Sequence, residues 1–280
     1  MHVLIAGCGY VGVRLAASLQ ESGYEVTGIK RSATEEHPGI QWIQGNICEP
    51  ASIQIAKPVD LLVLAAGLRR DTAENYQRLL VDGYRGLLDE LRNRRHPIQR
   101  VVLVSTTAVF AEHDGGWVDE TSPVTDDGLP ARYFLNAEAV VRASGFQAVV
   151  VRLAGLYGPG RIRLIREVRE GRAAHMSPPA QYLNQLHADD AAGALAHIVR
   201  LHDQAPLYVA SDRDPADRNE VLAWIADQLG VGPLPRADEL APSTARRSGN
   251  KRCRSILLER SGYAFRYPTY REGYANLLRE

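Results

Sequence analysis

Three glycines near the start of the chain have the spacing of a dinucleotide-binding loop. The run Val3-Leu4-Ile5-Ala6-Gly7-Cys8-Gly9-Tyr10-Val11-Gly12 carries the pattern G-x-G-x-x-G between an apolar run and a helical pattern, the context in which it is specific. The first glycine permits a tight turn, the second lets the backbone approach a pyrophosphate, and the third lets helix and strand pack closely. The alternative is a glycine-rich turn without a ligand. The residues predicted to bind the pyrophosphate are Gly7, Gly9, Tyr10, Val11 and Gly12.

Two adjacent cations favour NADP over NAD as the dinucleotide. An NAD site usually places Asp or Glu at the end of the second strand, about 20 residues after the glycines, where it binds the ribose 2′-hydroxyl. This chain has Lys30 and Arg31 there. A carboxylate would repel a 2′-phosphate, whereas a guanidinium pairs with it through a planar fork. The alternative is that both residues are solvated loop charges.

The elements that must position these residues alternate along the chain. Short apolar runs separated by helical patterns are typical of a parallel sheet with helices on both faces, so we predict an α/β fold with a Rossmann-type doubly wound parallel sheet. The expected strands are residues 2–6, 25–29, 41–44, 60–65, 100–105 and 148–153, and a helix is expected over 75–94. The residues expected to line the cofactor after the third and fourth strands are Asn46, Ala65, Ala66 and Gly67.

After residue 155 the pattern loosens and predicts a smaller C-terminal substrate lobe built from separated segments. The expected elements there are helices over 162–171, 189–201 and 219–229, a strand over 207–210 and a polar loop over 236–251. The predicted dinucleotide-binding domain covers 1–156, with segments near 182–211 returning to it, and the predicted substrate lobe covers 157–181 and 212–280.

The composition excludes several classes of protein. The chain has 280 residues, 45% of them hydrophobic, and a net charge of zero, which argues against a dedicated nucleic-acid or membrane-surface binder. Its three cysteines form no metal spacing and no disulfide framework, as in a reducing cytosol. No apolar run approaches the ~18 residues that span a bilayer, and the first expected strand leaves no room for a signal peptide. We therefore expect a cytoplasmic protein without a metal. The sequence leaves open whether it is a monomer or a homodimer.

Four further segments resemble the extended short-chain dehydrogenase/reductase group, which includes the NAD-dependent epimerase/dehydratase family. Residues 105–110 (STTAVF) resemble a strand end of that group, and 119–123 (DETSP) resemble its acidic loop. Residues 151–160 (VRLAGLYGPG) and 184–192 (NQLHADDAA) resemble two later segments. The closing stretches 250–252 and 265–274 resemble an atypical bacterial branch, related to epimerases and nucleoside-diphosphate-sugar-modifying proteins. The resemblance implies a nicotinamide cofactor and a small-molecule substrate, possibly a nucleotide sugar.

The resemblance also implies a catalytic set that this chain only partly keeps. A serine that orients the substrate matches Thr106, and an asparagine on the helix after the fourth strand matches Asp82. The group's Tyr-x-x-x-Lys pair, which lies eight and four residues before Glu138, is replaced by Pro130 and Phe134. Phenylalanine cannot hold the nicotinamide ribose or lower a tyrosine pKa.

Tyr133 is the side chain nearest to the missing acid. It is displaced by three residues, almost one helical turn, from the expected tyrosine position, and Arg132 beside it could supply positive charge. The alternative is that Tyr133 only packs against the core. The catalytic candidates are therefore Thr106, Tyr133 and Asp82.

Two other groups of residues have both a chemical and a structural interpretation. His187 with Asp189 and Asp190 suggests a metal or an acid–base pair, or else residues that order the fold. The arginines within 161–172 suggest contacts with substrate phosphates, or else a solvated face.

Two hypotheses remain. The first is an NADP-dependent epimerase, dehydratase or reductase that acts on a sugar nucleotide or a small carbonyl or hydroxyl substrate, with NAD as the less favoured cofactor. The second is a sensor or interaction protein that binds NADPH or NADP⁺ without turnover.

Overall fold

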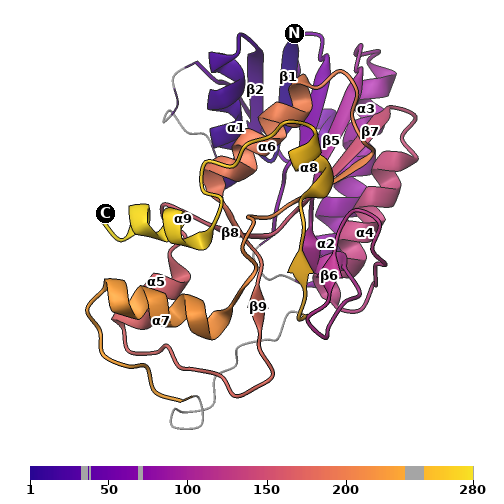
Figure 1. Ribbon diagram of the computed structural model, residues 1–280. Coiled ribbons are helices and arrows are strands. Elements are labelled where there is room, and N and C mark those ends of the chain that lie inside the picture. The colour runs from indigo at the N-terminus through magenta and orange to yellow at the C-terminus, as the bar shows by residue number, and fades with distance from the viewer. Residues whose placement is uncertain (33–36, 38, 69–71, 237–248, 280) are drawn as a thin grey trace. The chain divides into compact units, whose positions relative to one another are not determined.

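The computed structural model describes residues 1–32, 37, 39–68, 72–236 and 249–279 (Figure 1). They form two compact units, each assembled from three segments. The first unit consists of Met1–Val109, Thr125–Arg152 and Ala192–Tyr208. The second consists of Phe110–Val124, Leu153–Ala191 and Val209–Glu280.

A seven-stranded sheet forms the centre of the fold and confirms the predicted α/β Rossmann class. The strand order is β11-β7-β5-β4-β1-β2-β3, and the pairs from β5 to β3 are parallel. The order reverses at β1, which lies between β2 and β4, and ligands of such sheets bind at this switch point. The strands are β1 His2–Ala6, β2 Glu25–Lys30, β3 Gln41–Gln44, β4 Leu61–Leu64, β5 Arg100–Thr106, β7 Gln147–Leu153 and β11 Leu207–Ala210.

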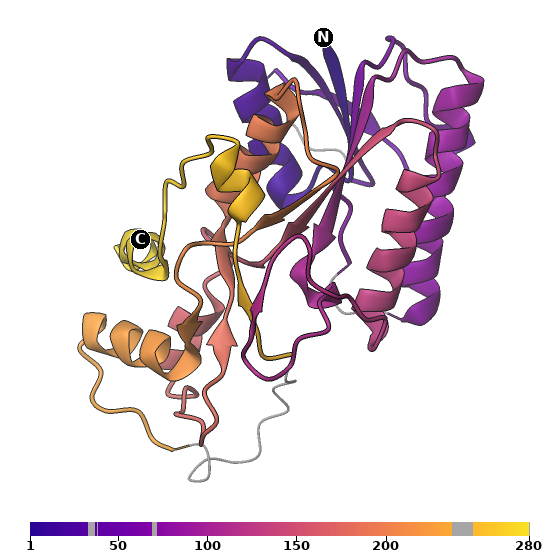
Figure 2. The same cartoon turned by 45° about the vertical axis from the view of Figure 1, so that its right-hand side comes forward.

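Helices cover both faces of this sheet (Figures 1 and 2). On one face lie α1 (Tyr10–Glu21) and α6 (Ala188–Arg200), and on the other lie α3 (Tyr84–Asn93) and α4 (Leu129–Arg142). The inner strands β1 and β4 are buried along their whole length because both of their faces are covered. On the face covered by α3 and α4, an apolar cluster joins these helices to β1, β4 and β5 through residues that include Leu4, Leu62, Leu103, Leu80, Tyr84, Leu87 and Val141.

The helix predicted over 75–94 is interrupted by a π-helical segment. It consists of α2 (Ala73–Tyr76), the π-helix η2 (Gln77–Gly83) and α3. A Cβ at Gly83 would lie 3.1 Å from the Arg78 carbonyl oxygen and 3.3 Å from that of Ile47. The glycine therefore lets the widened turn lie directly against the backbone that follows β3. Short 3₁₀ turns are formed by η1 (Pro50–Ser52) and η3 (Thr107–Val109).

In its described residues, the second unit combines two-stranded sheets with helices of its own. An apolar cluster from α5, α7 and α9 includes Leu164, Val168, Leu222, Ile225, Tyr270 and Tyr274. The paired strands are β8 (Gly155–Tyr157) with β10 (Gln185–His187), β9 (Tyr182–Leu183) with β12 (Ala216–Asp217), and β6 (Trp117–Val118) with β13 (Arg252–Cys253). The helices are α5 (Arg163–Arg169), α7 (Arg218–Gln228), α8 (Ile256–Arg260) and α9 (Tyr270–Leu277).

The division between the units differs from the sequence-based boundary at residue 156. That boundary left Phe110–Val124 in the dinucleotide-binding domain, whereas this segment belongs to the second unit. The reason is the parallel pairing of Trp117 with Arg252 and of Val118 with Cys253, which a local sequence pattern does not show. Of the loop predicted over 236–251, residues 237–248 lie outside the described residues. Among the helices that the structure describes, none has both the length and the apolar character of a membrane span.

A buried carboxylate ties three elements of the first unit together. Glu138 on α4 has 0% exposure. It accepts hydrogen bonds from Ser105 Oγ at 2.7 Å and from Arg152 Nε and Nη2 at 3.0 and 2.9 Å, and it also accepts one from Arg142 Nη2 at 3.0 Å. Burial alone would raise the pKa of Glu138, but the hydrogen bonds and the charge of Arg152 outweigh it and lower that pKa. The network joins the ends of β5 and β7 to α4.

Candidate functional site

The three glycines of the loop between β1 and α1 have different surroundings. Gly7 has φ +86°, and a Cβ on it would lie 2.3 Å from the Ala66 Cα, so no other residue fits there. At Gly12 a Cβ would lie 3.3 Å from Ile5 Cγ2, because the helix packs closely on the strand. Around Gly9 the nearest described atom to a Cβ is the Gly7 carbonyl oxygen, at 3.9 Å. The second glycine therefore leaves open space beside the loop, where the pattern predicts a pyrophosphate.

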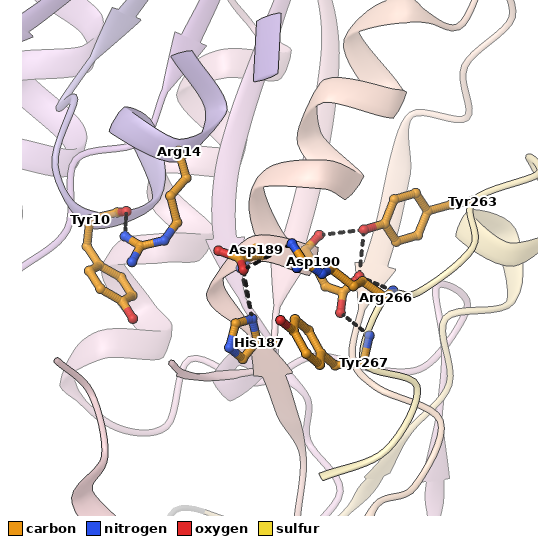
Figure 3. Close-up of polar contacts among 8 residues, drawn as sticks. All are labelled: Tyr10, Arg14, His187, Asp189, Asp190, Tyr263, Arg266 and Tyr267. Carbon is orange, nitrogen blue, oxygen red and sulfur yellow. Dashed lines mark hydrogen bonds and ion pairs between the residues drawn. The ribbon is translucent and has the colours of Figure 1, made fainter. Parts of the chain in front are cut away.

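The N-terminus of α1 is suited to an anion. Gly9 occupies its N-cap position and no side chain caps the helix, so the N–H groups of its first turn point outward with the positive end of the helix dipole. The loop before it is anchored, because Gly7 N and Cys8 N donate to the Ile29 carbonyl oxygen at 3.2 and 3.0 Å. Arg14 adds positive charge near this turn: its Nη1 donates to the Tyr10 carbonyl oxygen at 2.9 Å, as Figure 3 shows.

The ends of β1 and β4 meet at the switch point of the sheet. Ala65 N donates to the Ala6 carbonyl oxygen at 2.8 Å. The buried Tyr84 hydroxyl donates to the Ala66 carbonyl oxygen at 3.0 Å, and burial raises the pKa of Tyr84. Tyr84, which the sequence analysis did not single out, thus fixes the backbone of the predicted cofactor-lining segment.

The two cations proposed to select NADP lie at the end of β2. Lys30 is the last residue of the strand, and Arg31 follows it. Lys30 is half-buried, with its ammonium 5.8 Å from the centre of the Trp42 ring. Arg31 is exposed, and its carbonyl oxygen accepts a hydrogen bond from Gln44 Nε2 at 3.3 Å. Asn46 shapes the turn after β3, where its Oδ1 accepts from Cys48 N at 3.1 Å.

Thr106 and Asp82 occupy different local environments. Side chains alternate between the two faces of β5, and the Ser105 side chain lies in the buried network of Glu138. Thr106 therefore lies on the other face, where it is half-buried. Its hydroxyl accepts a hydrogen bond from Ala108 N at 3.2 Å. Asp82 is exposed on the π-helix η2, a type of segment that is frequent at functional sites, and it accepts from Gln77 Nε2 at 2.9 Å.

Tyr133 packs against another tyrosine. Its ring stacks on that of Tyr76 with centroids 5.9 Å apart and an angle of 9° between the planes. Tyr133 and Phe134 are both half-buried against the apolar core of the first unit. This packing explains why an aromatic residue stands at position 133, while its role as an acid stays a prediction.

His187, Asp189 and Asp190 order the second unit around the start of α6. The Asp189 N–H donates to His187 Nδ1 at 3.2 Å. The Asp190 carboxylate accepts from the Tyr263 hydroxyl at 2.9 Å and from the backbone N–H groups of Arg266 and Tyr267 at 2.7 and 2.8 Å (Figure 3). Among the residues that the structure describes, no three His, Cys, Asp or Glu side chains could hold a metal ion.

The arginines near α5 are partly neutralised. Arg163 Nη1 lies 2.8 Å from Glu167 Oε1, and Arg218 Nη2 lies 3.5 Å from Glu167 Oε2. Arg172 pairs with Glu170. Arg163 and Arg172, whose side chains are 63% and 58% exposed, have the surroundings of a solvated face, which was the alternative to phosphate contacts.

Comparison with known proteins assigns the family. The model of the NAD dependent epimerase/dehydratase family matches residues 3–209, which include β1, the glycine loop and the sheet just described. The chain belongs to the NAD dependent epimerase/dehydratase family. Protein YeeZ of Escherichia coli is 25% identical over 284 residues, covering 95% of this chain and 96% of YeeZ.

Solved structures of this family's fold superpose over the whole chain. One is a protein from Methylobacillus flagellatus that is described as an NAD-dependent epimerase/dehydratase. It is 31% identical to this chain with a TM-score of 0.80, and the match covers 99% of this chain and 97% of that one. Two more distant structures show likeness of fold alone. The human epimerase family protein SDR39U1 with NADPH has 22% identity, a TM-score of 0.80 and 100% coverage of both chains. MoeE5 with UDP-glucuronic acid and NAD has 21% identity, a TM-score of 0.81 and coverage of 100% of this chain and 98% of its own.

Proposed function

We propose that this chain is an atypical NADP-dependent epimerase, dehydratase or reductase, acting on a sugar nucleotide or on a small carbonyl or hydroxyl substrate. The observation that carries the proposal is the glycine loop. Its second glycine leaves open space beside an uncapped helix N-terminus, at the switch point of the sheet. A pyrophosphate fits that combination of space and charge.

The residues around the loop suit a nicotinamide dinucleotide. The first turn of α1 would hold the pyrophosphate, Ala65, Ala66 and Gly67 would line the ligand at the end of β4, and Arg31 would pair with a 2′-phosphate. When bound, the nicotinamide accepts or donates a hydride. The human neighbour binds NADPH and MoeE5 binds NAD, so the fold accommodates both dinucleotides, and the choice of NADP rests on Lys30 and Arg31.

We expect NADPH to bind more tightly than NADH, and Arg31→Ala to remove most of the difference. Losing a charge-assisted contact with phosphate costs roughly 1.5–3 kcal/mol, about tenfold or more in affinity. Fluorescence titration of both cofactors measures the effect. Arg78→Ala is the matched control, because Arg78 is an exposed arginine of the same unit that pairs with Glu49 at 3.6 Å. Equal affinities of the wild-type protein for NADPH and NADH would refute the choice of NADP.

A sugar nucleotide is the substrate class we favour, because MoeE5 shares the fold and binds UDP-glucuronic acid. Thr106 would contact the substrate through its hydroxyl. Its side chain lies half-buried at the end of β5, on the face opposite to the Glu138 network.

If the protein turns over substrate, we expect Tyr133→Phe to lower turnover by about 10²-fold or more, the scale for loss of a general acid. NADPH affinity should hardly change. The matched control is Tyr76→Phe, which removes the other hydroxyl of the same stacked pair and should leave turnover near that of the wild type. Steady-state kinetics on an accepted substrate decide the matter. Unchanged turnover in Tyr133→Phe would make Tyr133 a packing residue and move the acid to Asp82, the substrate or water.

The second candidate function is a sensor that binds NADPH or NADP⁺ without turnover. It is favoured by Pro130 and Phe134 at the positions of the usual Tyr and Lys, with Phe134 packed against the core. Transfer of label from stereospecifically deuterated NADPH separates the two functions. Label appearing in any member of a panel of carbonyl compounds and sugar nucleotides supports the enzyme, whereas tight NADPH binding without transfer across the panel supports the sensor.

A further inference from the structure

Asp212 is a carboxylate buried in the second unit without a hydrogen-bond partner. It is 2% exposed, and neither of its side-chain oxygens has a partner among the residues that the structure describes. The residue follows β11, and its backbone N–H donates to the Gln185 carbonyl oxygen at 2.7 Å. The backbone of Asp212 is therefore held beside β10, while the charge of its side chain is left uncompensated.

The charges that act on Asp212 have the wrong sign to compensate it. Burial raises the pKa of Asp212 well above its usual range, and the nearby Asp214 N–H, which lies outside hydrogen-bond geometry, offsets this only in part. The carboxylates of Asp214, Asp190 and Glu272 raise that pKa further. Asp212 thus lies in a negative environment, which favours a cation beside it.

Two arginines of this region are paired with other carboxylates. Arg213 Nε lies 2.8 Å from Glu259 Oε1, and Arg271 Nη1 lies 2.8 Å from Asp214 Oδ2. The side chains of these arginines are 52% and 49% exposed. Neither arginine therefore compensates the buried charge of Asp212.

Two more buried oxygens in this part of the second unit are without partners. Tyr157 is 3% exposed and Gln185 is 8% exposed, and within the described chain the Tyr157 hydroxyl and Gln185 Oε1 have no hydrogen-bond partner. The amide nitrogen of Gln185 is used, since Nε2 donates to the Tyr274 hydroxyl at 2.6 Å. The ring centroids of Tyr157 and Tyr274 lie 4.6 Å apart, so these side chains form one cluster.

The pairing of β8 with β10 places the cluster on one face of these strands. Tyr157 lies opposite His187, and Gln185, two residues before His187, points to the same face. Helix α9 covers the cluster closely, because a Cβ at Gly273 would overlap the Tyr157 hydroxyl oxygen. Burial raises the pKa of Tyr157, and the charge of Asp212 raises it further, as expected for a carboxylate close to this hydroxyl.

The unpartnered atoms are all oxygens, from a carboxylate, an amide and a hydroxyl. Such oxygens are the ligands of hard cations rather than of zinc or copper. A buried carboxylate without a partner costs stability, and one monovalent ion would neutralise it without leaving a net charge in the interior. We propose that Asp212, Gln185 and Tyr157 bind a monovalent metal cation, Na⁺ or K⁺, inside the second unit. This proposal does not depend on the proposed function.

Thermal unfolding of the full-length protein in different salts tests the proposal. The protein is dialysed into choline chloride, whose bulky organic cation serves as the reference, and choline is replaced stepwise by Na⁺ or K⁺ at constant chloride. We expect at least one of the two ions to raise the melting temperature by about 3 °C at about tenfold its dissociation constant. The rise should then continue with the logarithm of the ion concentration. The better-fitting ion is the one that acts at the lower concentration.

Three variants assign the effect to this cluster. Asp212→Asn keeps the size of the side chain and removes its charge, so it should abolish the ion-dependent rise in melting temperature. Tyr157→Phe removes one ligand oxygen, so the ion should need a severalfold higher concentration for the same rise. The matched control is Asp214→Asn, which changes a carboxylate that is 35% exposed and paired with Arg271 and should keep the rise.

Equal melting temperatures in all three salts would overturn the proposal, because Asp212 would then be accommodated by a proton or by water alone. A rise that persists in Asp212→Asn would also overturn it, since the ion would then act elsewhere. If Asp212→Asn fails to fold, a rise that Tyr157→Phe leaves unchanged overturns the proposal instead.

Discussion

Gly9→Val is expected to abolish dinucleotide binding in a protein that still melts cooperatively. A Cβ at Gly9 meets no described atom closer than 3.9 Å, so the valine side chain fills the open space where the pyrophosphate is proposed to lie. We expect affinity for NADPH to fall by more than about 100-fold, or about 2.8 kcal/mol. Fluorescence titration and a thermal melt on the same sample measure both quantities.

Gly7→Ala provides the contrast, because the first glycine belongs to the fold itself. Its φ of +86° and the 2.3 Å from its Cβ position to Ala66 Cα combine an unfavourable backbone conformation with overpacking. Each of these costs about 1–3 kcal/mol, so this variant should lose several degrees of melting temperature. Normal NADPH binding by Gly9→Val, with a cooperative melt, would show that the loop is not the dinucleotide site.

Glu138→Ala is expected to lower the free energy of unfolding by about 3–5 kcal/mol, the usual cost of removing one partner from a buried ion pair. The change leaves the Arg152 guanidinium, whose side chain is 5% exposed, without the carboxylate that it contacts twice. It also removes the acceptor of the Ser105 hydroxyl. Urea denaturation followed by circular dichroism measures the loss.

The partners of Glu138 supply the controls. Arg142→Ala should cost less than about 1 kcal/mol, because the side chain of Arg142 is 47% exposed and solvent screens its charge. The double variant Glu138→Leu with Arg152→Met should recover much of the stability lost in Glu138→Ala, since it leaves no unpaired buried charge. A loss below about 1 kcal/mol in Glu138→Ala would contradict the role of this network.

The sequence predicted the parts of the fold that depend on consecutive residues. The inner strands β1 and β4 are short apolar runs because both of their faces are covered. The observed β3 (Gln41–Gln44) and β11 (Leu207–Ala210) have the same bounds as the strands predicted there. The family resemblance was also confirmed, because the family model matches residues 3–209, which contain the resembling segments at 105–110, 119–123, 151–160 and 184–192. Local composition is sufficient here, since burial of a whole strand is visible in consecutive residues.

The parts that the sequence did not predict depend on contacts between distant residues. The π-helix at Gln77–Gly83 arises where Gly83 lies against the backbone of Ile47. The pairing of β6 with β13 joins strands of two residues each, which are too short to show any periodicity.

The candidate site shows the same division. The glycine spacing and the Lys30-Arg31 pair could be recognised from the sequence, because dinucleotide binding uses a contiguous loop and the end of the next strand. The hydrogen bond from the Tyr84 hydroxyl to the Ala66 carbonyl oxygen could not, because it joins a helix to a strand end 18 residues earlier. The stacking of Tyr133 on Tyr76 likewise joins two helices that are distant in the chain. Local patterns therefore determined the sheet and the predicted cofactor loop. Tertiary packing decided which charged and aromatic side chains are buried, because burial depends on neighbours that only the folded chain brings together.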